Sequence, residues 1–113
     1  MIRSWNEIRA HYADRPAVER SLQGMLKLVS EINSSRYRDG LFAWTSVNDL
    51  CIAQTSVSYP YNGPYLRISP IADGQLEFRY IDTPLEDKQW RRIVDGEDGF
   101  ARLERFIKQL HWF

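Results

Sequence analysis

The chain offers few of the residue types that usually perform chemistry, and they are scattered. Its single cysteine, Cys51, falls within a predicted strand, while the two histidines, His11 and His111, stand near opposite ends of the chain. Metal sites need three or four converging ligands, and a nucleophilic thiol needs exposure and a nearby base. A strand cysteine more often packs as a small buried hydrophobic residue. We therefore expect no metal site, no cofactor and no catalytic residue.

Carboxylates gather in two places without forming a recognisable site. The run from Asp95 to Gly99 resembles a calcium loop only in composition, because it lacks the alternating oxygen ligands and the distal glutamate of an EF-hand. A second group could supply a pair for acid–base catalysis and comprises Glu77, Asp82, Glu86 and Asp87. Among 15 acidic residues such groupings arise by chance. The sequence also lacks phosphate-binding glycine loops and serine-nucleophile motifs, so we favour a non-catalytic protein over an enzyme.

Aromatic and arginine side chains are the better candidates for a functional surface. Aromatic residues make up 13% of the chain, and Tyr, Trp and Arg dominate the energetics of protein interfaces. The segment from Tyr59 to Tyr65 holds three tyrosines and two prolines, so it would lose little entropy on binding, unless the tyrosines fold back over the sheet. The candidate binding residues are Phe42, Trp44, Tyr59, Tyr61, Tyr65, Arg67, Arg79, Trp90 and Trp112.

The charge balance narrows the class of partner. The 15 basic and 15 acidic residues give a net charge of zero, so no overall field draws the protein to nucleic acid or to an anionic membrane. Arginines interleaved with aromatic rings on one sheet face could still bind single strands. Pairing of these arginines with Glu77 and Asp82 is the simpler interpretation. We rank nucleic acid below another protein, or a second copy of the chain, as the partner.

The stretch from Leu41 to Asp82 must form the scaffold, because it holds consecutive β-forming runs joined by turn residues. In the second hairpin, a three-residue loop at 72–74 pairs Ile68 with Phe78 and Leu66 with Tyr80. This register separates an apolar face from a face that carries Arg67, Ser69, Glu77 and Arg79. A two-residue Asp73–Gly74 turn would mix the two faces, so we predict the longer loop, with Gly74 at positive φ.

The first hairpin is predicted around Asn48–Asp49, with Val47 opposite Leu50 and Trp44 opposite Ala53. Both faces of this hairpin then carry apolar residues. Either helices and loops cover parts of each side, or Phe42 and Trp44 lie on an open face and form a binding surface.

Helical patterns flank these strands. Ser4 and Glu7 fit a capping box before a short helix, and apolar residues recur at helical spacing over 16–33 and 99–111. Gly24 interrupts the first of these stripes, which indicates close contact with a neighbouring strand. The segment 84–94 fits two alternatives: a helix that begins after Thr83, or a fifth strand over 88–94.

These elements predict one α+β domain over residues 1–113. An antiparallel sheet of four or five strands (41–82, with 88–94 as the fifth) is covered by an N-terminal helix (16–33) and a C-terminal helix (99–111), in two layers. A lone cysteine, no basic-then-apolar leader after Met1 and no long apolar run indicate a cytosolic protein.

From these features we expect a non-catalytic protein-interaction module of a small bacterial-type protein, with inhibitor and immunity proteins within that class. One alternative is a small-molecule or enzymatic pocket between sheet and helices, lined by Trp44, Tyr80 and Trp90. A second alternative is an arginine-rich and aromatic sheet face that binds nucleic acid.

Overall fold

The computed structural model describes residues 2–14, 20–55 and 63–112. Within them the chain forms an α+β fold built on a five-stranded antiparallel sheet with the strand order β1-β2-β3-β4-β5. The strands are β1 (Phe42–Ser46), β2 (Asp49–Ala53), β3 (Tyr65–Pro70), β4 (Gln75–Ile81) and β5 (Trp90–Asp95). The α-helices are α1 (Trp5–Ala13), α2 (Arg20–Asn33) and α3 (Gly99–Gln109). The predicted fold class is confirmed, and the predicted helix residues 16–19 lie outside the described part.

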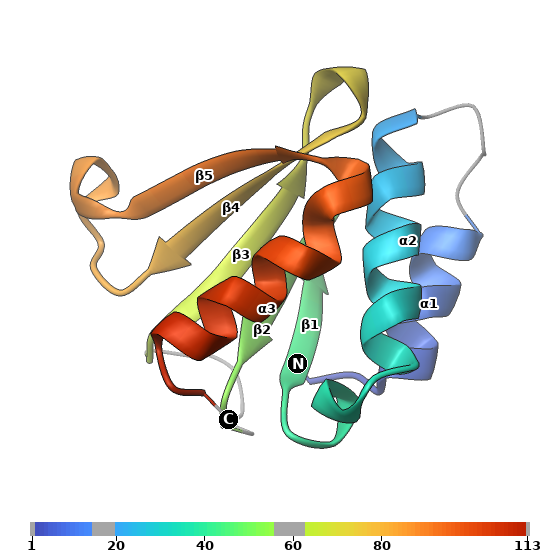
Figure 1. The fold of residues 1–113 in the computed structure, drawn as a ribbon, viewed down its shortest axis with the longest axis horizontal. Helices are drawn as coiled ribbons and strands as arrows, with labels where there is room; N and C mark the ends of the chain where they lie inside the picture. Colours follow the sequence, from blue (N-terminus) through green and yellow to red (C-terminus); the bar gives the residue numbers. More distant parts are fainter. Residues whose placement is uncertain (1, 15–19, 56–62, 113) are drawn as a thin grey trace.

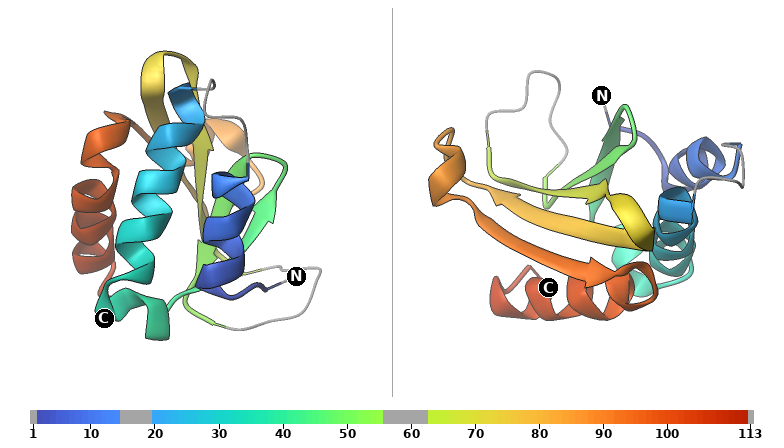
Figure 2. Two further views of the ribbon diagram at one scale, coloured as in Figure 1. Left: turned by 90° about the vertical axis from the view of Figure 1, so that its right-hand side faces the viewer. Right: turned by 90° about the horizontal axis from the view of Figure 1, so that it is seen from above.

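The helices are not distributed evenly around the sheet. Helices α2 and α3 lie on the same face of it, and α1 packs against α2 beside the edge strand β1 (Figures 1 and 2). Before α1, the backbone N–H of Arg3 donates to the carbonyl of Ala43 at 2.8 Å and so extends the sheet by one bridge. The predicted capping box of Ser4 and Glu7 is present at the start of α1. One sheet face thus carries the core, and the other faces away from the described helices.

The segment 84–94 forms a short 3₁₀ turn at Glu86–Lys88 followed by β5, so the strand alternative is correct. Thr83 and Pro84 favour the start of a helix, but the segment pairs with β4 instead. This pairing places Trp90 opposite Tyr80 and Val94 opposite Leu76. Both pairs lie on the face under the helices, where Trp90 and Val94 pack against the core. Burial of these side chains outweighs the weak local helix preference.

The hairpin of β3 and β4 has the predicted register. Ile68 lies opposite Phe78 and Leu66 opposite Tyr80, and the loop is the predicted Ala72–Gly74 turn. Gly74 has the predicted positive φ of 75°, and Asp73 also adopts a left-handed φ of 65°. Aspartate tolerates this conformation better than most residues.

The hairpin of β1 and β2 differs from its predicted register by two residues. The turn falls at 47–48, so Ser46 pairs with Asp49 and Trp44 with Cys51 rather than with Ala53. Helix α1 holds this turn: the Tyr12 hydroxyl donates to the Asn48 carbonyl at 2.9 Å, and Nε2 of His11 lies 3.1 Å from the Val47 carbonyl oxygen. Because the shift is even, each side chain stays on its predicted face.

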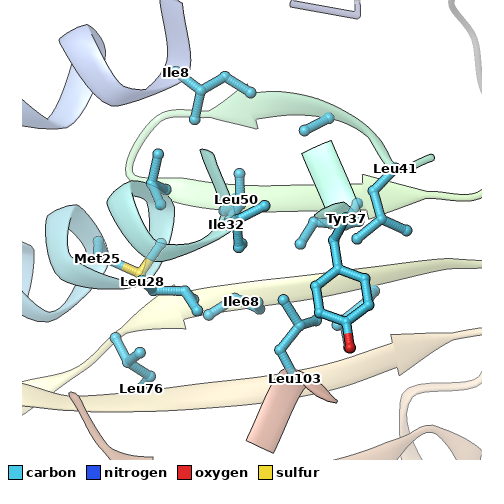
Figure 3. Close-up of a cluster of buried hydrophobic side chains, with 14 of the residues drawn as sticks. Ile8, Met25, Leu28, Ile32, Tyr37, Leu41, Leu50, Ile68, Leu76 and Leu103 are labelled. Atoms are coloured by element: carbon cyan, nitrogen blue, oxygen red, sulfur yellow. The ribbon is translucent and has the colours of Figure 1, made fainter. Parts of the chain in front are cut away.

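The core lies between the helix-facing side of the sheet and the three helices (Figure 3). Met25 and Leu28 of α2, Leu103 of α3, and Leu50 and Ile68 of the sheet are all fully buried. Met25 and Leu28 therefore both lie on the buried side of α2. The close-up shows Ile8 of α1 next to the first hairpin, so α1 completes the core at the β1 edge.

Three glycines allow α2 to approach the ends of β4 and β5. A Cβ atom at Gly96 would lie 2.7 Å from the carbonyl oxygen of Gly74 and 3.0 Å from the Cα of Gly24. One at Gly24 would lie 3.1 Å from the Cα of Gly96. Gly24 therefore makes a close contact, as predicted, but with the backbone of two turns of the sheet rather than with a strand.

Candidate interaction face

A row of five directly paired residues crosses the face of the sheet opposite α2 and α3. The pairing runs from Trp44 through Cys51, Arg67 and Arg79 to Arg91, one residue from each strand. Their neighbours along each strand point to the side of the sheet that α2 and α3 cover, because successive side chains of a strand alternate between faces. Figure 2 shows this side of the sheet turned away from α2 and α3. We call the row and its neighbours on this side the open face.

Two of the three arginines in the row are neutralised by carboxylates on the same face. Nε of Arg67 lies 2.7 Å from Oδ2 of Asp49, and both side chains are largely buried, with 24% and 21% exposure. Nε of Arg79 lies 3.5 Å from Oε1 of Glu77 within the same strand. The expected pairing of a sheet arginine with Glu77 is thus found at Arg79, whereas Arg67 pairs with Asp49.

Burial lowers the pKa of Arg67, but hydrogen bonds, above all the one to Asp49, outweigh that effect and raise the pKa above its ordinary value. The guanidinium is therefore permanently charged. The charge is fixed in place by its partner, so this part of the open face is a rigid, preorganised polar surface.

The third arginine of the row differs from the other two. Arg91 is exposed and lies directly opposite Arg79 on the neighbouring strand. Like charges in directly opposed positions of a sheet repel. Among the described residues, Arg91 forms no ion pair with a carboxylate. The row therefore ends, at the edge of the sheet, in a positive charge that is available to a partner.

Aromatic rings occupy the other end of the open face. The rings of Trp44 and Tyr65 are in contact, with centroids 5.3 Å apart and planes tilted by 48°. Phe42 precedes Trp44 by two residues in β1, so it lies on the same face, where it is opposite Ala53. All three rings are partly buried. The other two predicted tyrosines of this region, Tyr59 and Tyr61, lie outside the described residues.

Cys51 stands in the middle of the row but is not a reactive group. It is fully buried, as predicted. Burial raises the pKa of its thiol to about 11, although Arg67 and Arg79 act in the opposite direction. The thiol therefore stays protonated at neutral pH, and a protonated thiol is a poor nucleophile.

The structure places the last two predicted binding residues on the other side of the sheet. Trp90 and Trp112 both contact the ring of Phe106 in α3, at centroid distances of 5.6 and 5.3 Å. Tyr80 contacts the same ring at 5.3 Å. Trp44 lies on the opposite face from Tyr80 and Trp90, so these three do not line one pocket.

This second aromatic cluster includes a charged residue that sequence reasoning missed. Arg102 of α3 is only 8% exposed, and its guanidinium carbon lies 5.5 Å from the centre of the Trp90 ring. Burial lowers the pKa of Arg102, and Arg92 and Arg105 add to this effect. Arg102 falls on the polar side of the helical pattern, so only the position of β5 could reveal its burial.

A groove of about 430 Å³ lies at one end of the sheet, at the glycine contact of α2 with the sheet turns. It is lined by Gln23, Gly24, Lys27, Asp73, Gly74, Asp95, Gly96 and Glu97. Lys27 already pairs with Glu31 at 2.7 Å. Nowhere in the described residues do three potential metal ligands converge.

Comparisons with known proteins place no further constraint on the site. No protein-family model matches the chain, and neither curated proteins nor solved structures yield a significant match. Across the described part of the chain, no helix has the length and apolar character that a membrane span requires.

Proposed function

We propose that this chain is a non-catalytic interaction module that binds another protein through its open face. The observation that carries the proposal is the row from the Trp44–Tyr65 ring pair to Arg91, which crosses all five strands on the side away from α2 and α3. Trp, Tyr and Arg are the residue types most enriched among interface hot spots. The ion pair of Arg67 with Asp49 and the ring contact of Trp44 with Tyr65 hold these side chains in place, so binding through them would cost little side-chain entropy.

The chemistry of the face indicates what the partner presents. The ring pair favours an apolar or aromatic side chain, and the unpaired guanidinium of Arg91 favours a carboxylate. Asp49 and Glu77 already neutralise Arg67 and Arg79, so the face is mixed in charge rather than uniformly basic. A folded protein surface with both apolar and acidic groups suits it better than a polyanion. Inhibitor and immunity proteins fall within this class, and the lone buried thiol is compatible with a cytosolic location.

A quantitative pull-down tests the proposal. Tagged wild-type protein and the variant Trp44→Ala would be used as baits in extracts of the native host, after circular dichroism has shown that both are folded. We expect Trp44→Ala to lower recovery of the partner about tenfold or more, as truncation of a hot-spot tryptophan does. Leu85→Ala is the matched control, because Leu85 is 58% exposed and lies in the turn before β5. Equal recovery by all three baits would contradict the proposal.

Two further variants separate the regions of the face. Arg91→Ala removes the free charge, whereas the triple variant Tyr59→Ala, Tyr61→Ala, Tyr65→Ala removes the predicted tyrosine segment. Loss of the partner with either variant would extend the site to that region. Retention of wild-type protein on single-stranded DNA, weakened by salt and by Arg91→Ala, would instead favour the nucleic-acid alternative.

A further inference from the structure

The two edge strands of the sheet, β1 and β5, differ in how much of their outer edge is covered. The outer edge of β1 is covered by α1 and by the backbone bridge from Arg3 to Ala43. Strand β5 forms the other edge and, in the part of the chain that the structure describes, pairs with β4 alone (Figure 1). Within the described residues, no backbone hydrogen bond from a turn, loop or cap reaches residues 90–94, and Asp95 leads into the 3₁₀ turn Gly96–Asp98. An edge strand of this length presents unpaired N–H and C=O groups that can accept another strand.

The side chains of β5 are also unusually exposed. Ile93, in the middle of the strand, is 54% exposed, the highest value for a large hydrophobic residue within any described strand. Arg91 and Asp95 flank it on the same face and are both exposed. The exposed face of β5 thus carries a positive charge, an apolar side chain and a negative charge in turn. When a second copy of the strand runs antiparallel to the first, each charge lies opposite a charge of the other sign.

We propose that β5 pairs antiparallel with β5 of a second copy of this chain, about a two-fold axis at Ile93. In this register Ile93 lies opposite Ile93 of the second copy. Arg91 then lies opposite Asp95 of the second copy, and Asp95 opposite the second copy's Arg91. Directly opposed side chains in antiparallel strands have Cβ atoms about 4.5–5.5 Å apart, within reach of an ion pair. The contact is isologous, as expected for a two-fold dimer.

Other registers lack this complementarity. A shift by one residue places open-face side chains against side chains from the helix face, which a sheet with one buried face does not tolerate. A shift by two in one direction places Arg92 opposite Arg92 of the second copy and leaves Arg91 opposite Ile93. A shift by two in the other direction places Ile93 opposite Asp95. The register centred on Ile93 therefore combines an apolar centre with two ion pairs.

In the single chain, Arg91 and Asp95 have no oppositely charged residue directly across the sheet. Arg91 lies opposite Arg79, and Asp95 lies opposite Gln75. Asp95 precedes the 3₁₀ turn Gly96–Asp98, but its side chain makes no capping hydrogen bond there. Among the described residues neither takes part in an ion pair. Dimerisation would give each of these groups a partner and would join the two open faces in one continuous sheet.

Mass measurements on the purified chain test the proposal. Sedimentation and light scattering over a wide concentration range should show a shift from 13.4 kDa towards twice that mass. We expect a concentration-dependent dimer, because a single pair of edge strands is a small interface. Arg91→Asp and Asp95→Arg should each weaken the dimer about tenfold or more, since both ion pairs become repulsive. The double variant Arg91→Asp, Asp95→Arg should restore it.

Cross-linking provides an independent measure of the register. Under mild oxidation Ile93→Cys should form a disulfide-linked dimer, because the two introduced thiols face each other across the axis. Leu85→Cys is the matched control, with a similar exposure of 58%, and should cross-link far more slowly. The native Cys51 is buried and should not contribute.

A monomeric mass at every concentration would overturn the proposal. So would a dimer that persists equally in the two single charge variants, or equal cross-linking at positions 85 and 93. These outcomes leave the pull-down with Trp44→Ala unaffected, because Trp44 lies in β1, at the opposite edge of the sheet from β5. Self-association and partner binding can therefore succeed or fail separately.

Discussion

Nε of Arg67 lies 2.7 Å from Oδ2 of Asp49, diagonally across strands β2 and β3 on the open face of the sheet. The ion pair joins the first hairpin to the second, and Arg67 lies two residues from Tyr65 of the ring pair, on the same face of β3. It is the contact that makes the open face a fixed surface rather than a set of independent side chains.

Asp49→Asn should lower the free energy of unfolding by about 1–2 kcal/mol, because it removes the charged partner from a largely buried guanidinium. Urea unfolding followed by circular dichroism measures this change. In the background of Arg67→Met the same substitution should cost much less, since no unpaired charge remains. Equal costs in the two backgrounds would show that the ion pair does not stabilise the fold.

Gly96→Ala should destabilise the protein by more than about 2 kcal/mol, because overpacking against rigid backbone cannot be relieved by side-chain motion. The new Cβ would lie 2.7 Å from the Gly74 carbonyl oxygen. Gly74→Ala is the informative comparison. It meets no atom within 4 Å but requires a φ of 75°, so it should cost only about 1 kcal/mol. The opposite order of costs would contradict this account of the contact.

Cys51 should make stability fall with rising pH. Burial raises the pKa of its thiol from 9.0 to about 11, so between these values the folded protein keeps a proton that the unfolded chain loses. The unfolded state then binds fewer protons, and the free energy of unfolding should decrease by about 1 kcal/mol per pH unit in this window.

The variant Cys51→Ala isolates this effect, because the other titrating groups are common to both proteins. Its free energy of unfolding, measured in urea near pH 9.0 and near pH 11, should change less than that of the wild type. Parallel pH profiles for the two proteins would mean that the folded-state pKa of the thiol is not raised.

Phe106→Ala should lower the free energy of unfolding by about 3–4 kcal/mol, as truncation of a buried phenylalanine does. Phe106 is 3% exposed and is the ring shared by Tyr80, Trp90 and Trp112. Its loss should also shift the tryptophan fluorescence of the folded state towards longer wavelength. Leu85→Ala, at a site that is 58% exposed, should change neither quantity appreciably.

Features that repeat along the chain could be predicted from the amino-acid sequence. Alternation of side chains assigned Phe42, Trp44, Arg67 and Arg79 to their faces, and helical spacing located α2 and α3. The loop at Ala72–Gly74 was also predictable, because only one loop length keeps the apolar residues of both strands together. These properties depend on neighbouring residues, so local patterns contain them.

Contacts between groups that are distant in the sequence depend on the tertiary structure and could not be predicted. Contacts from His11 and Tyr12 in α1 fix the turn at 47–48, although they stand 36 residues away in the sequence. Pairing with β4 made 90–95 a strand, and that strand buried Trp90 against Phe106 and so removed it from the open face. Local preferences in these segments differ by only a fraction of a kcal/mol, so the burial of side chains from other elements determines the outcome.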